Sequence, residues 1–306
     1  MDLKGKKVLL AGGTGLIGSH LIGLLKDEGV EISLLSRSSG EHKGIKAYEW
    51  STVDETMDES ALDGVDYIIN LAGAGIADKR WTDSRKKVII ESREKSAAVI
   101  KKYLIKTGVK PKCYLSASAV DYYGDRGEER LTEDSPPGTG FLTEAVQKWE
   151  RAADELASIT TVKKLRIGLV LSARGGALPS MAGPQKFGLG ALLGGGKQFY
   201  PWVHIEDVAR MMIFLLKNEE QKGVFNGVSP EPITQRDMVD AIAKGMGRPA
   251  LKFPVPAFAL RLALGEMSDL VLNSRKVVPE RMEKEGYEFK FTDATEALRD
   301  LAERKV

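Results

Sequence analysis

The 306-residue sequence predicts an α/β fold, in which helices cover both faces of a doubly wound parallel sheet. Continuous apolar runs begin at Val8, Val30 and Val65, as expected of strands buried on both faces. Segments with helical spacing separate these runs, so strand and helix alternate along the chain. The predicted strands are residues 8–10, 30–37, 65–73, 112–116, 165–171 and 223–226. The predicted helices are 19–25, 84–104, 142–156 and 234–246, and residues 202–216 combine a short strand with a helix.

The composition favours a globular protein without a strong overall charge. A formal net charge of +2 provides no field that would select nucleic acid or an anionic membrane surface. The single cysteine, Cys113, excludes an internal disulfide, and no Cys/His cluster has the spacing of a metal site. No apolar run is long enough to span a membrane. We therefore expect a cytoplasmic monomer or homodimer that binds a small-molecule substrate, with no metal, membrane or nucleic-acid partner.

The most informative segment lies between the first predicted strand and the first predicted helix, where Gly12, Gly15 and Gly18 are spaced three apart. One glycine permits a sharp turn, one lets the backbone approach a pyrophosphate, and one lets the helix pack closely on the sheet. The helix N-terminus then presents free N–H groups to the phosphates. The segment predicts a dinucleotide site. Its expected cofactor-binding residues are Gly12, Thr14, Gly15, Leu16, Ile17 and Gly18.

The end of the second predicted strand indicates which dinucleotide is bound. A cofactor without a 2′-phosphate is usually held there by an acidic residue, whereas this chain has Ser36, Arg37 and Ser38. An arginine–phosphate contact contributes about 1.5–3 kcal/mol, which corresponds to roughly a tenfold to hundredfold preference. We predict NADP(H) rather than NAD(H), bound by these three residues. The alternative is that Arg37 is a solvated loop residue.

The composition changes after Ser172, since residues 173–197 contain eight glycines and two prolines. Such a stretch is too irregular for one continuous element, and we expect a lid or substrate loop. After Arg248 the pattern indicates helices and short loops. The predicted division is a dinucleotide-binding domain at 1–172, to which elements near 200–228 return, and a substrate loop with a smaller, mostly helical lobe at 173–306.

Motifs along the whole chain resemble those of the extended short-chain dehydrogenases/reductases, the NAD-dependent epimerase/dehydratase family. Within it the chain is similar to the branch labelled nucleoside-diphosphate-sugar epimerase, the 39U subfamily. The resemblance implies a Rossmann domain whose strand ends carry the cofactor. The motifs are residues 11–18, 70–73, 76–81, 92–93, 116–120, 122–124, 149–150, 202–207 and 264–267. The cofactor-binding residues that it adds are Leu71, Ala72, Gly73, Ser116 and Arg166.

The resemblance also implies hydride transfer, with Ser and Tyr binding the substrate oxygen and a Lys four residues after the Tyr lowering its pKa. Without such help, a phenolate at neutral pH costs about 4 kcal/mol. Ser118 matches the serine, but Leu142 and Val146 occupy the positions of the Tyr and Lys. Both fall on the apolar face of their predicted helix, so we expect them to pack in the core, and the standard mechanism lacks its proton donor.

Two replacements for the missing pair are open. Tyr122 or Tyr123 could approach the substrate from the loop after Ser118, or Lys79 and Arg80 could enter from the loop after residues 65–73. We prefer Tyr122 and predict Ser118 and Tyr122 as the catalytic residues. The alternative for the tyrosines is that Tyr122 packs and Tyr123 hydrogen-bonds within its own turn.

Lys79, Arg80 and Trp81 are predicted to bind the substrate, because they follow a strand at the edge of the sheet where open α/β folds bind ligands. Two cations and an indole can hold an anionic or phosphorylated group. Alternatively, Trp81 packs on the following helix and Arg80 pairs with an acid. Arg93, farther along that helix, could reach the site or an internal carboxylate.

Two residues in the predicted strand–helix segment 202–216, His204 and Asp207, are expected to be structural rather than catalytic. Two functional hypotheses follow. The first is an NADP(H)-dependent oxidoreductase or epimerase-like enzyme of the extended short-chain type, with a non-standard active site. The second, motivated by Leu142 and Val146, is a catalytically inactive dinucleotide-binding regulatory or interaction protein.

Overall fold

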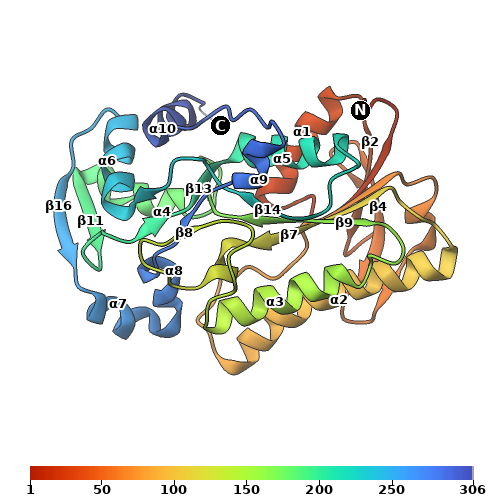
Figure 1. The fold of residues 1–306 in the computed structure, drawn as a ribbon, viewed down its shortest axis with the longest axis horizontal. Helices are drawn as coiled ribbons and strands as arrows, with labels where there is room; N and C mark the ends of the chain where they lie inside the picture. The colour runs from red at the N-terminus through yellow and green to blue at the C-terminus, as the bar shows by residue number, and fades with distance from the viewer. Residues whose placement is uncertain (305–306) are drawn as a thin grey trace.

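The computed structural model describes residues 1–304, which form a twisted central sheet between layers of helices (Figure 1). The strand order is β14-β9-β7-β6-β1-β2-β4-β3, with β5 paired to β4. All neighbours are parallel except the pairs that β4 makes with β3 and β5. The predicted doubly wound parallel sheet is therefore confirmed. Its strands are β1 (Lys7–Ala11), β2 (Glu31–Ser36), β3 (Gly40–His42), β4 (Ile45–Ser51), β5 (Thr56–Met57), β6 (Tyr67–Asn70), β7 (Cys113–Ala119), β9 (Thr161–Ile167) and β14 (Gly223–Gly227).

Each face of the sheet has its own apolar core. Val8 and Leu10 of β1 belong to the core that includes helices α1 (Leu16–Asp27) and α5 (Ile205–Lys217). Leu9 and Ala11 point the other way, into a core that includes α2 (Asp83–Thr107). This alternation follows from the period of two along a strand. Helix α3 (Phe141–Asp154) lies beside α2, as Figure 1 shows.

The predicted strand at 165–171 is divided at Gly168, which is a correction. A Cβ at Gly168 would lie 2.1 Å from the carbonyl oxygen of Pro201, so the chain can pass there only as glycine. The Leu169 N–H donates to the same Pro201 carbonyl. As a result β10 (Leu169–Leu171) leaves the main sheet and pairs with β13 (Trp202–His204). This exit carries the following loop toward α1, where a Cβ at Gly176 would lie 3.2 Å from Leu16.

The C-terminal part is mostly helical, as predicted, but it also contains two five-residue strands that were not expected. β16 (Leu251–Val255) pairs with β11 (Leu189–Leu193) in a separate two-stranded parallel sheet. β16 contains Pro254, a residue that the interior of a sheet excludes, so the sequence there did not indicate a strand. Strand β4, at residues 45–51, was also not predicted, and β7 extends to Ala119. The glycine-rich segment contains only short elements, α4 (Leu178–Ala182), a 3₁₀ turn (Pro184–Phe187) and β11.

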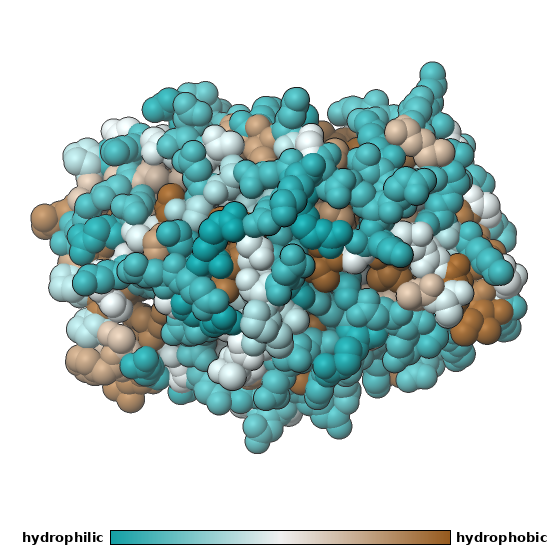
Figure 2. Space-filling model, in the orientation of Figure 1, coloured by the Kyte–Doolittle hydropathy of each residue, from teal (hydrophilic) through white to brown (hydrophobic). Residues whose placement is uncertain are grey.

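The remaining elements complete this part of the chain. Helix α6 (Gln235–Gly245) begins with a capping box between Thr234 and Asp237. The others are a 3₁₀ turn at Glu59–Leu62, η2 (Val120–Tyr123), β8 (Arg130–Leu131), β12 (Phe199–Tyr200), β15 (Ile233–Thr234), α7 (Ala257–Leu264), η4 (Gly265–Ser268), α8 (Asp269–Leu272), β17 (Lys276–Val277), α9 (Glu280–Lys284) and α10 (Ala294–Glu303). Apolar side chains gather at the end of the molecule where β16 and α7 lie (Figure 2), and they include Leu251, Phe258 and Leu262. No helix in residues 1–304 is long and apolar enough to cross a membrane.

His204 and Asp207 have the structural roles predicted for them. The fully buried His204 caps α5, because its Nδ1 accepts the N–H of Glu206 at 3.1 Å. Asp207 accepts hydrogen bonds from the hydroxyl of Tyr287 and from the N–H groups of Lys290 and Phe291. The N-terminus of α5 is thereby joined to the last loop of the chain.

Burial lowers the pKa of His204 from 6.5 to about 4, so the folded protein keeps this imidazole neutral. The unfolded chain binds a proton near pH 6.5 and the folded chain does not, so stability present above that pH is lost as the pH falls toward about 4. We predict that the free energy of unfolding, measured with urea at several pH values, falls less over this window in His204→Asn, since asparagine can still cap the helix.

The matched control is His42→Asn, on the short edge strand β3, where the side chain is only half-buried. It should retain the pH dependence of the native protein. An unchanged slope in His204→Asn would contradict the assignment.

Candidate dinucleotide and substrate site

The glycine-rich loop after β1 has the shape that a phosphate site requires. Gly12 has a φ of +79°, and a Cβ there would lie 2.8 Å from the backbone carbon of Leu71. A Cβ at Gly18 would lie 2.6 Å from the carbonyl oxygen of Gly12. Packing within the protein therefore accounts for these two glycines. Gly15 differs, because it is exposed and its Cβ would approach only one protein atom, at 3.3 Å. Gly15 thus leaves the backbone open on its outer side.

Helix α1 begins at this open side. Its N-cap is Gly15, and the first turn has neither a capping side chain nor an acidic residue. The N–H groups and the positive end of the helix dipole are therefore available to an anion. Thr14 is exposed beside them, while Leu16 and Ile17 are half-buried. The predicted loop residues thus lie together around one free helix N-terminus.

The end of β6 lies against this loop. The Leu71 N–H donates to Ala11 of β1, and the buried Asn70 fixes the following turn by accepting the N–H of Ala72. Leu71 and Ala72 are half-buried and Gly73 is exposed, so their backbone borders the loop.

Arg37 lies just beyond the end of β2 and is exposed, with Ser38 exposed and Ser36 half-buried. Within residues 1–304 no side chain forms an ion pair with Arg37. Neighbouring β1 ends in the glycine loop, because β1 and β2 are parallel and in register from Lys7 with Glu31 to Ala11 with Leu35. A cation without a protein partner therefore stands one strand away from the free helix N-terminus.

Ser116 and Arg166, the other two expected cofactor residues, are turned into the protein. Ser116 is 1% exposed and its hydroxyl donates to the carbonyl of Ala117. Arg166 is 3% exposed, and its Nε and Nη2 donate to the two carboxylate oxygens of Glu150 at 2.7 and 2.8 Å. The Arg166 guanidinium is thus engaged by an internal carboxylate.

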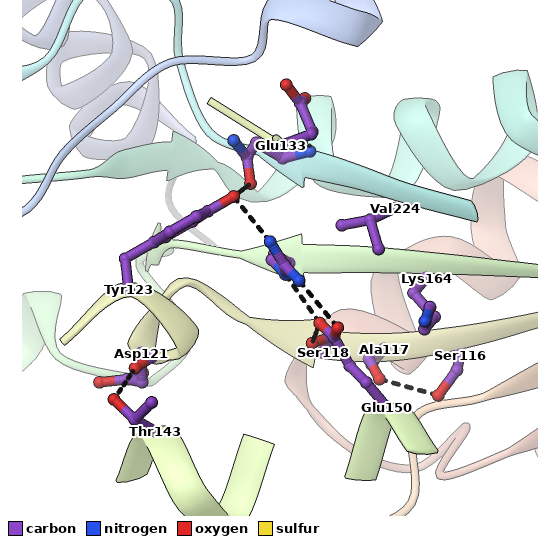
Figure 3. A network of polar contacts seen from close by, with 12 residues as sticks. Ser116, Ala117, Ser118, Asp121, Tyr123, Glu133, Thr143, Glu150, Lys164 and Val224 are labelled. Atoms are coloured by element: carbon purple, nitrogen blue, oxygen red, sulfur yellow. Dashed lines mark hydrogen bonds and ion pairs between the residues drawn. The ribbon is translucent and has the colours of Figure 1, made fainter. Parts of the chain in front are cut away.

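Figure 3 shows the polar network around this ion pair. The Ser118 hydroxyl donates to Glu150 at 2.6 Å, from the end of β7 to helix α3. Arg166 also donates from Nη1 to the hydroxyl of Tyr123, which in turn donates to Asn226 of β14 at 2.8 Å. The expectation that Tyr123 hydrogen-bonds within its own turn is therefore wrong. Burial raises the pKa of Tyr123 to about 12, so this phenol keeps its proton at neutral pH.

Tyr122 is the one tyrosine of the pair that the network leaves open. Its ring lies over the Arg166 guanidinium, with 3.4 Å between the guanidinium carbon and the ring centroid. Its side chain is half-buried, and no residue among 1–304 hydrogen-bonds its hydroxyl. Ser118 and Tyr122 are thus brought together through Arg166, since one bonds to its counter-ion and the other stacks on it.

Leu142 and Val146 are buried on α3, as expected. Leu142 packs in a small apolar cluster with Ile89 of α2 and with Trp81. The indole N–H of Trp81 donates to the carbonyl of Ile76 at 2.9 Å. The prediction that Trp81 binds the substrate is therefore corrected. As the alternative stated, its ring packs against the following helix, and its N–H is used in a hydrogen bond within the loop.

Lys79 and Arg80 remain exposed on the same loop. No acidic residue of the described chain, 1–304, pairs with Arg80 as the alternative proposed. Its Nη2 lies 3.2 Å from where a Cβ on Gly265 would stand. Arg85, which sequence reasoning missed, holds the loop by donating to the carbonyl of Gly75 and pairing with Asp78 at 3.6 Å. Two cations thus project from a loop that is fixed at its base.

A second ion pair joins this region to the C-terminal part. Arg275 lies 2.9 Å from the carboxylate of Asp121, which directly precedes Tyr122. Its Nε also donates to the carbonyl of Gly124. Sequence reasoning missed this pair and assigned no role to Glu150, although residues 149–150 were among the motifs. Glu150 did carry a signal, because a carboxylate among the apolar residues of the α3 face requires a buried partner.

A glycine-rich loop at the carboxyl edge of a parallel sheet, opening on a free helix N-terminus, defines a Rossmann-type dinucleotide-binding protein. The chain belongs to the NAD dependent epimerase/dehydratase family, whose model matches residues 8–226. A second model, described as a domain of unknown function, matches residues 255–301. The resemblance inferred from the motifs is confirmed.

Relatives that match nearly the whole of this chain support the assignment. The mouse epimerase family protein SDR39U1 is 35% identical, over 96% of this chain and 99% of the relative. An epimerase family protein of Staphylococcus saprophyticus is 37% identical over 97% and 99%. The crystal structure of human SDR39U1 (isoform 2) with NADPH matches with a TM-score of 0.87 and 32% identity, over 97% of this chain and 99% of that one. A nucleoside-diphosphate sugar epimerase from Corynebacterium glutamicum matches with a TM-score of 0.80 and 28% identity, over 99% and 59%.

The Arg166–Glu150 pair gives a test of the site's construction. We predict that Glu150→Leu lowers the free energy of unfolding by about 3–5 kcal/mol, because it leaves Arg166 buried without a counter-ion. The double variant Glu150→Leu/Arg166→Met should lose less, since neither charge then remains. Urea unfolding of both variants measures the difference. If the single and the double variant lose the same free energy of unfolding, the loss does not come from an unpaired Arg166, and the role given to the charge pair is contradicted.

Proposed function

We propose that the protein is an NADP(H)-dependent oxidoreductase or epimerase-like enzyme of the extended short-chain type. The observation that carries this proposal is Arg37, which pairs with no residue of 1–304 and lies one strand away from a phosphate loop with a free helix N-terminus. A guanidinium suits a 2′-phosphate in both charge and geometry. The human relative solved with NADPH supports the same cofactor.

The proposed cofactor residues divide by the part of the dinucleotide that they meet. The backbone of residues 12–18 would hold the pyrophosphate, and Arg37 with Ser36 and Ser38 would hold the 2′-phosphate. Residues 71–73 would border the sugar. Arg166 and Ser116, both buried, would act by fixing the strand ends. When bound, the nicotinamide supplies or accepts a hydride.

The proposed chemistry at the substrate oxygen rests on Tyr122. Its phenol has no partner among residues 1–304 and can therefore give a proton to a substrate oxygen or take one from it. The stacked Arg166 would stabilise the phenolate that remains, in the manner of a cation beside a ring. Ser118 is 3% exposed and donates its own hydrogen to Glu150, so it would meet the substrate only through its remaining lone pairs, at the bottom of the site.

In this proposal the substrate is a small molecule with an anionic group that Lys79 and Arg80 hold. The proposed domains are a dinucleotide-binding domain at 1–172, to which elements near 200–228 return, and a substrate loop and lobe at 173–306. The first domain also carries Lys79, Arg80, Ser118 and Tyr122. The alternative is an inactive dinucleotide-binding regulator. The burial of Leu142 and Val146 favours it, because neither can move a proton from the family's usual positions.

The cofactor preference is tested at Arg37. We predict that Arg37→Ala weakens NADPH binding roughly tenfold to a hundredfold and leaves NADH binding unchanged, because only NADPH carries the 2′-phosphate. Titration of nicotinamide fluorescence measures both. Arg151→Ala, an exposed arginine on α3, is the matched control and should change neither. No NADPH binding by the native protein would refute the proposal.

Turnover is tested at Ser118 and Tyr122. Carbonyl compounds with and without anionic groups would be screened with NADPH, following the near-ultraviolet absorbance of the reduced nicotinamide. For any substrate found, Tyr122→Phe should lower kcat about a hundredfold or more, as expected for loss of a general acid, and Ser118→Ala should lower it less. Activity that both variants retain would reject this site, and the absence of any turnover would favour the regulator.

A further inference from the structure

Arg93 of α2 is a buried cation that no carboxylate neutralises. Its side chain is 8% exposed, yet its one hydrogen bond within residues 1–304 runs from Nη1 to the carbonyl of Ile89, one turn earlier in its own helix. No acidic side chain in that part of the chain comes within ion-pair distance of it. The sequence left open whether Arg93 reaches the site or an internal carboxylate, and within residues 1–304 the carboxylate partner is not found.

The surroundings of Arg93 hold its guanidinium in one place. The guanidinium carbon lies 4.8 Å from the centroid of the Trp149 ring on α3. It also lies against Gly73, where a Cβ would stand 3.1 Å from that carbon. A side chain at position 73 would therefore displace the guanidinium. Gly73 is exposed, so the cation reaches the carboxyl edge of the sheet from beneath this glycine.

Burial lowers the pKa of Arg93 to about 10, with Asp121 opposing the shift. The guanidinium nevertheless remains protonated at neutral pH. A buried charged group is costly unless hydrogen-bond acceptors surround it. Among residues 1–304, most of the N–H donors of Arg93 have no such acceptor, so a ligand oxygen at Gly73 would complete the arrangement.

The strand order indicates which part of a dinucleotide meets Arg93. Arg37 follows β2, the glycine loop follows β1, and Gly73 follows β6, which lies on the other side of β1. A dinucleotide with its 2′-phosphate at β2 and its pyrophosphate at β1 extends its second half over β6 and β7. We propose that Arg93 binds the nicotinamide ribose of the cofactor, donating from beneath Gly73 to a ribose oxygen. This inference rests on the proposed function.

Val146 on α3 lies one turn before Trp149 and cannot provide a cation from its own helix. Arg93 stacks on Trp149 from the neighbouring helix α2, so it brings a positive charge to this part of the site by another route. The proposal therefore assigns Arg93 as a cofactor-binding residue that sequence reasoning left undecided.

The test separates the two halves of the cofactor by calorimetric titration with NADPH and with adenosine 2′,5′-bisphosphate, which lacks the nicotinamide ribose. We expect Arg93→Met to weaken NADPH binding about tenfold to a hundredfold and to leave bisphosphate binding unchanged. Arg37→Ala should weaken both, because both probes carry the 2′-phosphate. Arg151→Met is the matched control and should alter neither.

Equal weakening of both probes in Arg93→Met, or no weakening of either, would overturn the inference while leaving the proposed function standing. Failure of the native protein to bind either probe would overturn both. Thermal unfolding and circular dichroism verify that each variant is folded. Should Arg93→Met not fold, Arg93→Lys carries the test, because lysine retains the charge but has one nitrogen and a shorter reach; selective weakening of NADPH is again the expected result.

Discussion

The ion pair between Arg166 and Glu150 determines how the carboxyl edge of the sheet is built. Removing two charges from water is costly, and the arrangement is stable only when the remaining donors and acceptors are satisfied. Here the two oxygens of Glu150 receive three hydrogen bonds, two from Arg166 and one from Ser118. These bonds fix β7, β9 and α3 relative to one another, and Tyr123 extends the same network to β14.

This network also decides which groups remain available for chemistry. It uses the hydrogen atoms of Ser118 and Tyr123. The ring of Tyr122 packs on Arg166 and on the small apolar cluster around Val120, and its hydroxyl bonds to no residue among 1–304. The exposed cations Lys79 and Arg80 stand on a loop whose base is fixed by Arg85. The hydrogen-bonded network therefore lies below the hydroxyl of Tyr122 and the two exposed cations. A binding site on a parallel sheet requires such an arrangement, in which fixed residues position the groups that meet the ligand.

Local rules predicted the parts of the molecule that depend on neighbours in sequence. The glycine spacing of residues 12–18, the continuous apolar strands and the apolar positions of Leu142 and Val146 all follow from short-range patterns. The polar network could not be predicted in this way, because Ser118 and Glu150 are 32 residues apart and Tyr123 and Asn226 are 103 apart. The division of the predicted strand at Gly168 likewise depends on Pro201, which only the folded chain brings close.

Three arginines near the same edge show how environment assigns different roles to one residue type. Arg166 is neutralised by Glu150 and is part of the framework. Arg37 is exposed to water, so its charge is solvated and does not lower the stability of the fold when no anion is bound. Arg93 combines the burial of the first with the missing carboxylate of the second. A charge in that position lowers the stability of the empty protein, and such a cost is retained where a ligand offsets it. The glycine loop therefore indicates that a dinucleotide binds. In the proposed arrangement the arginines orient it, from Arg37 after β2 to Arg93 beneath Gly73.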